Sequence, residues 1–237
     1  MQAIVICTVS NPGISVLLES IKVYAPSLPV YIYSVDISRG ERFKRILPNA
    51  VIRSNTGRNF GESYNEAITD VFGRIPFDSL IVANDDVVLN PSTLALLRED
   101  KQILEENGQK IGFLGARSDY VLPDQNIRFP VPDDRQEGLY WASERMIKDV
   151  PVIAPIFAII TKEAWNIAKF PRTNWYSDNI ICHDLQEAGY RHFVSRAYVH
   201  HAGSQTVGMD YKKCHEEPRA WIKENRPDMY EVIYGNG

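Results

Sequence analysis

Cysteine is scarce in this sequence, and the cysteines present follow no recognisable pattern. Cys7, Cys182 and Cys214 are three of 237 residues, an odd number without the spacing of a zinc site. Isolated thiols of this kind are typical of a reducing compartment rather than of a disulfide-stabilised fold. The sequence also lacks an apolar run long enough to span a bilayer and a basic leader before its first apolar stretch. We therefore predict a cytoplasmic protein without an integral membrane segment.

Positive charge is not concentrated anywhere along the chain. Lys and Arg number 26 against 30 Asp and Glu, which gives a formal net charge of -4 at pH 7. Without a Lys/Arg cluster, binding to nucleic acid or to an anionic membrane surface is not favoured. An anionic ligand would need a bound cation or a helix N-terminus beside it.

The glycine-rich phosphate-binding motifs are missing from the full sequence. Neither G-x-G-x-x-G nor the P-loop pattern occurs. Their absence argues against a dinucleotide-dependent dehydrogenase and against a P-loop NTPase.

Short apolar runs alternate with helical patterns through the first half of the chain. We predict buried strands at 3–9, 29–35, 50–53 and 80–83, all too short and too rich in β-branched residues for helices. Between them, apolar residues recur at helical spacing, as from Tyr64 to Phe72. This alternation favours a mostly parallel, Rossmann-like sheet with right-handed crossovers.

The second half of the chain is less regular. We predict strands at 111–116, 155–160 and 191–201, a helix at 178–188 capped by Ser177, and a final helix around 211–224. Segment 117–150, rich in proline, charge and aromatic residues, is expected to form loops and short antiparallel strands. At 237 residues the chain fits one α/β domain, with a mixed sheet covered by helices on both faces.

The stretch from Ser79 to Pro91 is the most informative in the sequence. A buried strand ends in Asn84, Asp85 and Asp86, at the point where open α/β sheets bind ligands. Adjacent carboxylates repel each other, and a hard cation with oxygen ligands is the natural way to keep both ionised. An acidic turn whose side chains cap local backbone groups is the simpler alternative.

Three segments together resemble GT-A fold glycosyltransferases of the family 2 type, with rhamnosyltransferase-like relatives. The segment 80–91 looks like the D-x-D segment of that family, 177–190 like its E-D-x-D-L-x-x-R-x-x-x-A-G-Y helix, and 199–206 like its V-x-H-H-G-G-x-S segment. The resemblance covers nearly the whole chain and implies a single GT-A domain. Residues 1–90 would form its nucleotide-sugar-binding half and residues 91–237 its acceptor-binding half.

The resemblance also implies roles for individual residues. Asp86 would bind the divalent metal, Mn²⁺ or Mg²⁺, and Asp178 would be the catalytic base. His201 would be the second metal ligand, with His200 as the alternative. At a helix N-terminus the charged form of Asp178 is favoured, so we expect it to be ionised. Each side chain also has a purely structural alternative, as a helix N-terminal residue or a strand-end partner of a carboxylate.

The remaining predicted site residues belong to the two substrates. Those assigned to the donor are Thr8, Ser10 and Asp36 on the side of the nucleotide base, Asn59 and Asn65 in a segment resembling N-x-G-x-x-x-x-N, and Asn84 and Asp85 beside Asp86. Asp36 could equally be a turn residue. Trp141 and Trp175 could stack on an acceptor sugar, although packing within the fold is the commoner fate of such rings.

Several positions depart from the pattern of the family. Asn84-Asp85-Asp86 is not a strict D-x-D, Ser177 replaces an acidic residue, and Ile180 and Asp184 break the helix pattern. The sequence Arg219-Ala220-Trp221 matches the Q-x-x-R-W signature of processive members only faintly, which favours transfer of a single sugar.

The resemblance predicts a metal-dependent, inverting, non-processive glycosyltransferase. Its donor would be a nucleoside-diphosphate sugar of the UDP or dTDP type, with UDP preferred, and its acceptor a hydroxyl group. Two alternatives stay open: a sugar-phosphate nucleotidyltransferase, and a nucleotide-sugar-binding module without turnover. The nucleotidyltransferase would normally carry a glycine-rich basic loop after the first strand, and Ser10-Asn11-Pro12-Gly13 is not such a loop.

Overall fold

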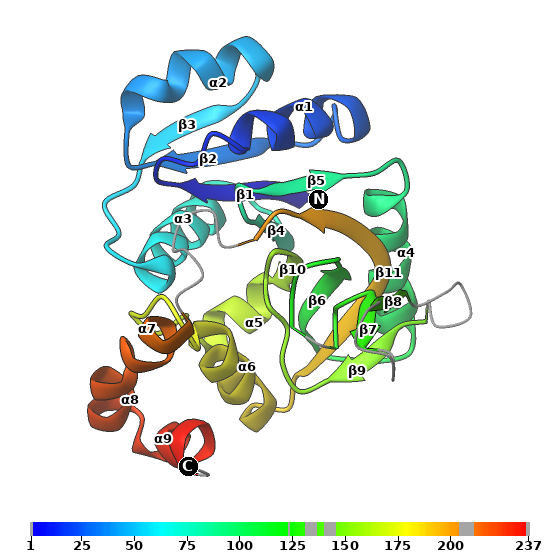
Figure 1. The fold of residues 1–237 in the computed structure, drawn as a ribbon. Coiled ribbons are helices and arrows are strands. Elements are labelled where there is room, and N and C mark those ends of the chain that lie inside the picture. The colour runs from blue at the N-terminus through cyan, green and yellow to red at the C-terminus, as the bar shows by residue number, and fades with distance from the viewer. Residues whose placement is uncertain (1, 123, 131–136, 140–145, 204–210, 236–237) are drawn as a thin grey trace.

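The computed structural model describes residues 2–122, 124–130, 137–139, 146–203 and 211–235 (Figure 1). Its centre is a mixed sheet in the order β3-β2-β1-β4-β10-β6-β11-β5, with β9 also paired to β11. Its strands are β1 (Gln2–Thr8), β2 (Val30–Ser34), β3 (Val51–Ser54), β4 (Ser79–Ala83), β5 (Val87–Leu89), β6 (Ile111–Arg117), β9 (Lys148–Val150), β10 (Phe157–Thr161) and β11 (Arg191–His201). Two short strands, β7 (Arg128–Pro130) and β8 (Glu137–Leu139), form a separate antiparallel pair, as expected for the irregular segment.

Helices cover both faces of the sheet. They are α1 (Ile14–Tyr24), the 3-10 helix η1 (Ile37–Arg39), α2 (Gly40–Ile46), α3 (Phe60–Arg74), α4 (Thr93–Glu106), α5 (Lys162–Ile167), α6 (Ser177–Glu187), α7 (Tyr211–Glu216), α8 (Arg219–Asn225) and α9 (Pro227–Tyr234). Figure 1 shows α1 and α2 on one side of β1–β3, and α3 on the other. None of the described helices is both long and apolar enough to cross a membrane.

The strands have continuous apolar sequences, without polar alternation, because both faces of the sheet are buried. Along β1, Ile4 and Ile6 belong to one core cluster with α1, whereas Ala3 and Val5 belong to a second cluster with α3. All four side chains are fully buried. The fold therefore has three layers, with the sheet between two cores.

The strand directions place several loops at one edge. Strands β3, β2, β1 and β4 run parallel, so the carboxyl ends of β1, β2 and β4 lie together. Strand β10 is antiparallel to β4 and β6, and β11 runs parallel to β6. Because His201 at the end of β11 pairs with Val87, the last strand returns to the residues that follow β4.

Two predicted helix boundaries differ from the structure. The single helix expected around 211–224 is divided into α7 and α8 before Pro218, and α9 follows. Helix α6 begins at Ser177 itself, and Tyr176 occupies the capping position without a side-chain cap. Helix α4 begins at Thr93, after a turn in which Asn90 Oδ1 accepts from Ser92 N at 2.9 Å.

A buried histidine ties α6 to the sheet. His192 is fully buried in β11, where its Nδ1 accepts from Phe113 N at 3.1 Å. Its Nε2 lies 2.9 Å from the carbonyl of Cys182 in α6 and donates to it. Burial lowers the pKa of His192, although the Cys182 carbonyl and Asp149 act in the opposite direction. The folded protein therefore favours the neutral imidazole at this position.

This burial predicts a loss of stability in mild acid. The unfolded chain binds a proton at His192 as the pH falls through about 6.5, whereas the folded chain resists it. Between about pH 7 and about pH 5, the free energy of unfolding of the wild type should fall more steeply than that of His192→Gln. The difference in slope cannot exceed about 1.4 kcal/mol per pH unit. Denaturant titrations across this range measure it, and equal slopes would show that His192 does not titrate differently on folding.

Candidate active site

A buried carboxylate–imidazole contact lies at the edge where β1, β4 and β11 end. Asp86 Oδ1 is 3.1 Å from His201 Nε2, and both side chains are less than a tenth exposed. The backbone fixes the same contact, since Ala202 N donates to the Asp86 carbonyl at 3.0 Å. The structure thus brings together two residues that are 115 positions apart and were both predicted as metal ligands.

The two neighbouring histidines point to opposite sides of β11. His200 is 55% exposed and its Nδ1 lies 2.7 Å from Asp119 Oδ2, on the surface. His201, one residue further along the strand, faces inward to Asp86. Because side chains alternate along a strand, only one of the pair can reach the carboxylate. The geometry favours His201 over His200 as the residue that could share a metal with Asp86.

The other nitrogen of His201 is held by the backbone. His201 Nδ1 lies 2.5 Å from the carbonyl of Tyr120 and donates to it, which leaves Nε2 directed at Asp86. Burial acts to lower the pKa of His201, but the hydrogen bond and charge of Asp86, with smaller contributions from Tyr120 and Asp119, raise it overall. Without a metal, the contact with Asp86 therefore favours the protonated imidazole of His201.

The Asp86–His201 pair fits two adjacent ligands of one octahedral ion. Ligand atoms about 2.1 Å from an ion and at right angles lie about 3.0 Å apart, close to the observed 3.1 Å. The Tyr120 carbonyl holds the tautomer in which Nε2 can ligate after losing its proton. Within the described ranges, no group of three or more His, Cys, Asp or Glu side chains could hold a metal, so an ion here would need oxygen ligands from a substrate or water.

Asp85 points away from this pair and is held by residues that follow β1. Its Oδ1 accepts from Asn11 Nδ2 at 3.0 Å, and Asn11 Oδ1 in turn accepts from Gly13 N at 2.8 Å. Arg39 donates to the carbonyls of Val9 and Asn11, at 3.1 and 2.8 Å. Sequence reasoning treated Asn11 only as part of a turn and did not single out Arg39. The polar turn after the first strand was the available signal.

The environment of Asp85 opposes its ionisation. Burial raises the pKa of Asp85 and the charge of Asp86 acts in the same direction, whereas Thr8, Asn11 and Arg39 act against them. The Thr8 hydroxyl is buried, and it makes no hydrogen bond to Asp85 or to any other described residue. A buried hydroxyl in that state is available to a ligand.

The other two residues predicted on the base side are more exposed. Ser10 is exposed just beyond β1, and Asp36 is exposed just beyond β2. The Asp36 carboxylate accepts from Ser38 N and Ser38 Oγ at 3.0 and 2.6 Å, which lowers its pKa. The simpler alternative, a turn residue, therefore describes the contacts of Asp36 in this structure.

The two predicted asparagines at the start of α3 have different structural roles. Asn59 caps the helix, since its Oδ1 accepts from Glu62 N at 2.9 Å. The amide of Asn65 is fully used by the backbone of Phe170, with contacts of 2.8 and 3.1 Å. Gly61 allows the close approach, because a Cβ there would meet the Pro171 carbonyl at 1.7 Å. Asn65 thus holds the segment that leads to α6, whereas Asn59 caps α3.

Asp178 lies in the first turn of α6, at the end of that segment. Its Oδ1 accepts from Asn179 N at 3.0 Å, and the residue is partly exposed. Burial raises the pKa of Asp178 despite the opposing backbone hydrogen bonds. Desolvation thus acts against the charged form that the helix N-terminus was expected to favour, and the ionisation of Asp178 stays a prediction.

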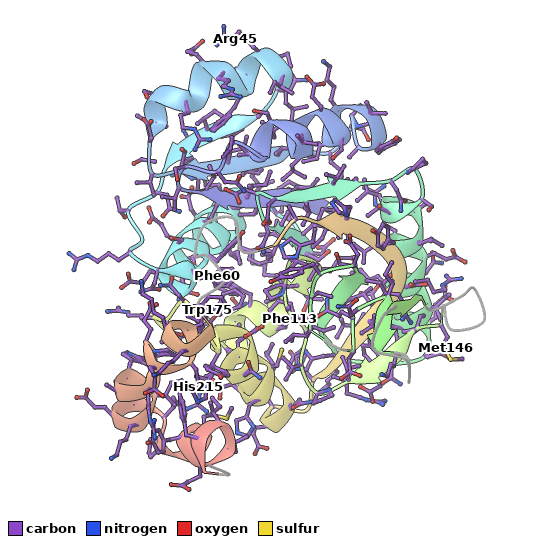
Figure 2. All side chains as sticks on the ribbon, viewed as in Figure 1. Arg45, Phe60, Phe113, Met146, Trp175 and His215 are labelled. Atoms are coloured by element: carbon purple, nitrogen blue, oxygen red, sulfur yellow. The ribbon has the colours of Figure 1, made fainter. Side chains whose placement is uncertain are left out.

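Trp175 is the one predicted acceptor residue that the structure describes. It is partly exposed, and Figure 2 labels it in the same part of the view as Phe60, whose N donates to the neighbouring Asn174 Oδ1 at 3.0 Å. Its carbonyl accepts from Thr173 Oγ1 at 2.9 Å, so its backbone is fixed while part of its ring faces solvent. Trp141 lies outside the described residues.

The residue between Trp175 and α6 has a strained backbone. Tyr176 has φ +60°, and it is the sole non-glycine residue with positive φ in the described part of the chain. Its hydroxyl lies 2.6 Å from His215 Nδ1, and its ring packs edge-on against His215 and Tyr234. Such conformations cost about 1–3 kcal/mol and persist where surrounding contacts impose them. Sequence reasoning missed this residue.

The C-terminal helices also account for two departures from the family pattern. Ile180 is buried against Ile222 and Met229. The Asp184 carboxylate accepts from Arg226 at 3.0 and 2.8 Å, in a bidentate contact. Figure 1 shows α7–α9 grouped beside α6. The residues that break the pattern thus form the surface on which these helices dock.

Comparison with known proteins identifies the fold. No protein-family model matches the chain, and no curated protein sequence matches it. The crystal structure of S. aureus TarS 1-349 has a TM-score of 0.55 at 13% identity, over 98% of this chain and 68% of that one. Its complex with UDP-GlcNAc has a TM-score of 0.56 at 14% identity, over 94% of this chain and 66% of that one.

A second similar structure is GalNAc-T7 with UDP, GalNAc and Mn²⁺. Its TM-score is 0.66 at 11% identity, over 98% of this chain and 50% of that one. Both proteins are GT-A glycosyltransferases. The predicted α/β fold of the GT-A class is therefore confirmed, and at these identities the likeness defines the fold and not the activity.

The hydroxyl of Tyr176 provides a test of the contact with α7. Tyr176→Phe removes the hydrogen bond to His215 and should lower the free energy of unfolding by about 1 kcal/mol. Tyr24→Phe, at an exposed position on α1, is the matched control and should have little effect. Thermal or denaturant unfolding of both variants gives the comparison, and equal stabilities would show that the hydroxyl contact does not hold α7 against α6.

Proposed function

We propose that this protein is a metal-dependent glycosyltransferase that moves one sugar from a nucleoside-diphosphate sugar to a hydroxyl acceptor. The buried contact between Asp86 and His201 is the observation that carries the proposal. It lies at the carboxyl edge of the sheet, where open α/β folds bind nucleotides. The GT-A fold shared with TarS and GalNAc-T7 supports the same activity. The narrower likeness to rhamnosyltransferase-like family 2 members and the cytoplasmic location remain predictions.

Asp86 Oδ1 and His201 Nε2 would hold the metal. A bound Mn²⁺ or Mg²⁺ would neutralise the negative charge that develops on the departing diphosphate. Two protein ligands leave the remaining positions for phosphate oxygens and water, which is usual for ions that accompany nucleotides. The imidazole ligand favours Mn²⁺ over Mg²⁺, and the GalNAc-T7 structure contains Mn²⁺.

The donor nucleotide would lie over the ends of β1 and β2. The exposed apolar side chains Val9, Val35 and Ile37 offer a surface for the base, next to Ser10 and Asp36. Asn84 Nδ2 lies 3.5 Å from His201 Nε2, and the donor would also meet the buried Thr8 hydroxyl and the Asp85 carboxylate that accepts from Asn11. Asn65 would contribute indirectly, by holding segment 170–174, and Asn59 by capping α3. UDP is the preferred nucleotide because TarS was solved with UDP and with UDP-GlcNAc.

Asp178 would accept the proton of the attacking hydroxyl. A carboxylate with a raised pKa is a stronger base than an ordinary one, provided that it remains ionised at the working pH. Trp175, partly exposed just before α6, would bind the acceptor. A direct displacement by the acceptor would invert the anomeric carbon and transfer one sugar per event.

The two alternatives predict different products. A sugar-phosphate nucleotidyltransferase would release pyrophosphate from a nucleoside triphosphate, and a module without turnover would bind UDP and metal but neither hydrolyse nor transfer the donor. Two departures from the family pattern, Ile180 and Asp184, are accounted for by the docking of α8 and α9.

Nucleotide binding should require the metal and Asp86. At about 100 times its Kd, UDP should stabilise the protein by about 2.7 kcal/mol in a thermal-shift titration with Mn²⁺. The shift should vanish without Mn²⁺ and in Asp86→Ala, and should persist in the control Asp149→Ala, whose carboxylate pairs with Arg191 at the surface. Titration with dTDP, GDP, CDP and ADP ranks the bases. No shift with any diphosphate would contradict the proposal.

Replacement of the proposed base should separate chemistry from binding. Asp178→Asn should keep the Mn²⁺-dependent shift with UDP, because Asp178 does not contact the predicted metal ligands. Its rate of sugar transfer should fall by about 10²–10⁴-fold. The rate is measured by release of UDP from a donor panel in the presence of carbohydrate acceptors. A loss of less than about tenfold would remove Asp178 from the role of base.

A further inference from the structure

Strand β11 contains a bulge before it reaches the active site. In its first half it pairs with β6, from Arg191 to Val194, with a first register shift between Arg191 and Phe193. The register then shifts, since four steps along β11 from Val194 to Tyr198 match only two steps along β6 from Gly115 to Arg117. After the shift, β11 pairs with β5 and ends with His201 beside Asp86. Figure 1 shows the resulting curve of β11 from β6 toward β5.

One buried carboxylate on α4 holds this bulge. Asp100 is fully buried, and its Oδ2 accepts from Ser195 Oγ at 2.6 Å and from Arg196 N at 2.7 Å. Its Oδ1 accepts from Arg196 Nε at 2.6 Å. Ser195 Oγ also accepts from Ala197 N at 2.9 Å. Side chains therefore satisfy two successive backbone N–H groups of the bulge.

The beginning of α4 fixes the next residue of the strand. The carbonyl of Tyr198 accepts from Thr93 Oγ1 at 2.7 Å and from Asn90 Nδ2 at 3.2 Å. Helix α4 thus contacts β11 at both ends of the irregular stretch. A charge-assisted contact in a buried site is a strong and directional constraint, and its loss leaves polar groups unpaired.

We infer that Asp100 is a positioning residue for the proposed metal site. By fixing the two extra residues of β11, it sets which side of the strand His201 occupies and how far the strand extends. A shift of one residue would turn His200 inward and His201 outward. The effect of Asp100 on metal affinity rests on the proposed function. Its effect on the position of His201 does not, because that position can be measured without metal.

The test compares three variants of the full chain. Asp100→Asn removes the charge. Ser195→Ala removes only the hydroxyl that joins Asp100 to Ala197 N, and this variant replaces Asp100→Asn in the test if Asp100→Asn fails to fold. Leu104→Ala, a buried position on the same helix, controls for a general loss of stability. One readout is the ring N–H signal of His201 in metal-free protein, which reports the hydrogen bond to Tyr120. The other is the affinity for Mn²⁺ in the presence of UDP, by titration with electron paramagnetic resonance.

We expect Asp100→Asn and Ser195→Ala to shift or broaden the His201 signal and to weaken Mn²⁺ binding by about 10–100-fold, the range for groups that orient metal ligands. Leu104→Ala should change neither readout. Unchanged signal and affinity in the two bulge variants, or equal changes in Leu104→Ala, would overturn the inference. If the wild type binds no Mn²⁺, the proposed function fails, and the His201 signal alone decides the positioning role.

Discussion

The contact between Asp86 and His201 depends on the arrangement of the whole sheet. Asp86 follows the central strand β4, and His201 ends the last strand β11, so the contact forms only when the two halves of the chain share one sheet. Both side chains are buried, and each is oriented by the backbone of another segment: Asp86 by Ala202, and His201 by Tyr120. The chemistry proposed for this edge is therefore a consequence of the tertiary fold.

Local sequence pattern was sufficient for much of this arrangement. The β-branched run from Leu80 to Ala83 predicted a buried strand, and the polar residues after it predicted a site at the end of that strand, where the structure places Asp86. The choice between His200 and His201 could not be settled in the same way. It depends on which residues of β11 face inward after a bulge, and that register is set by Asp100, about a hundred positions earlier in the chain.

Long-range contacts explain the features that sequence reasoning missed. Asn11 and Asp85 are 74 positions apart, and no local pattern marks them as partners. Tyr176 is an aromatic residue in a backbone conformation that favours glycine, so its sequence identity argues against the geometry that it adopts. The conformation is imposed by α7–α9, which pack on Tyr176 through His215 and Tyr234. The strained turn and Asp178 thus depend on helices at the other end of the domain.

The central claim is that Asp86 and His201 bind one divalent ion together with a nucleoside diphosphate. Pulsed electron paramagnetic resonance of Mn²⁺ and UDP bound to the protein tests it most directly. The account predicts coupling of Mn²⁺ to one imidazole nitrogen and to phosphorus. The nitrogen coupling should be lost in His201→Ala and kept in His200→Ala. A spectrum without nitrogen coupling, or with coupling that depends on His200, would contradict the account.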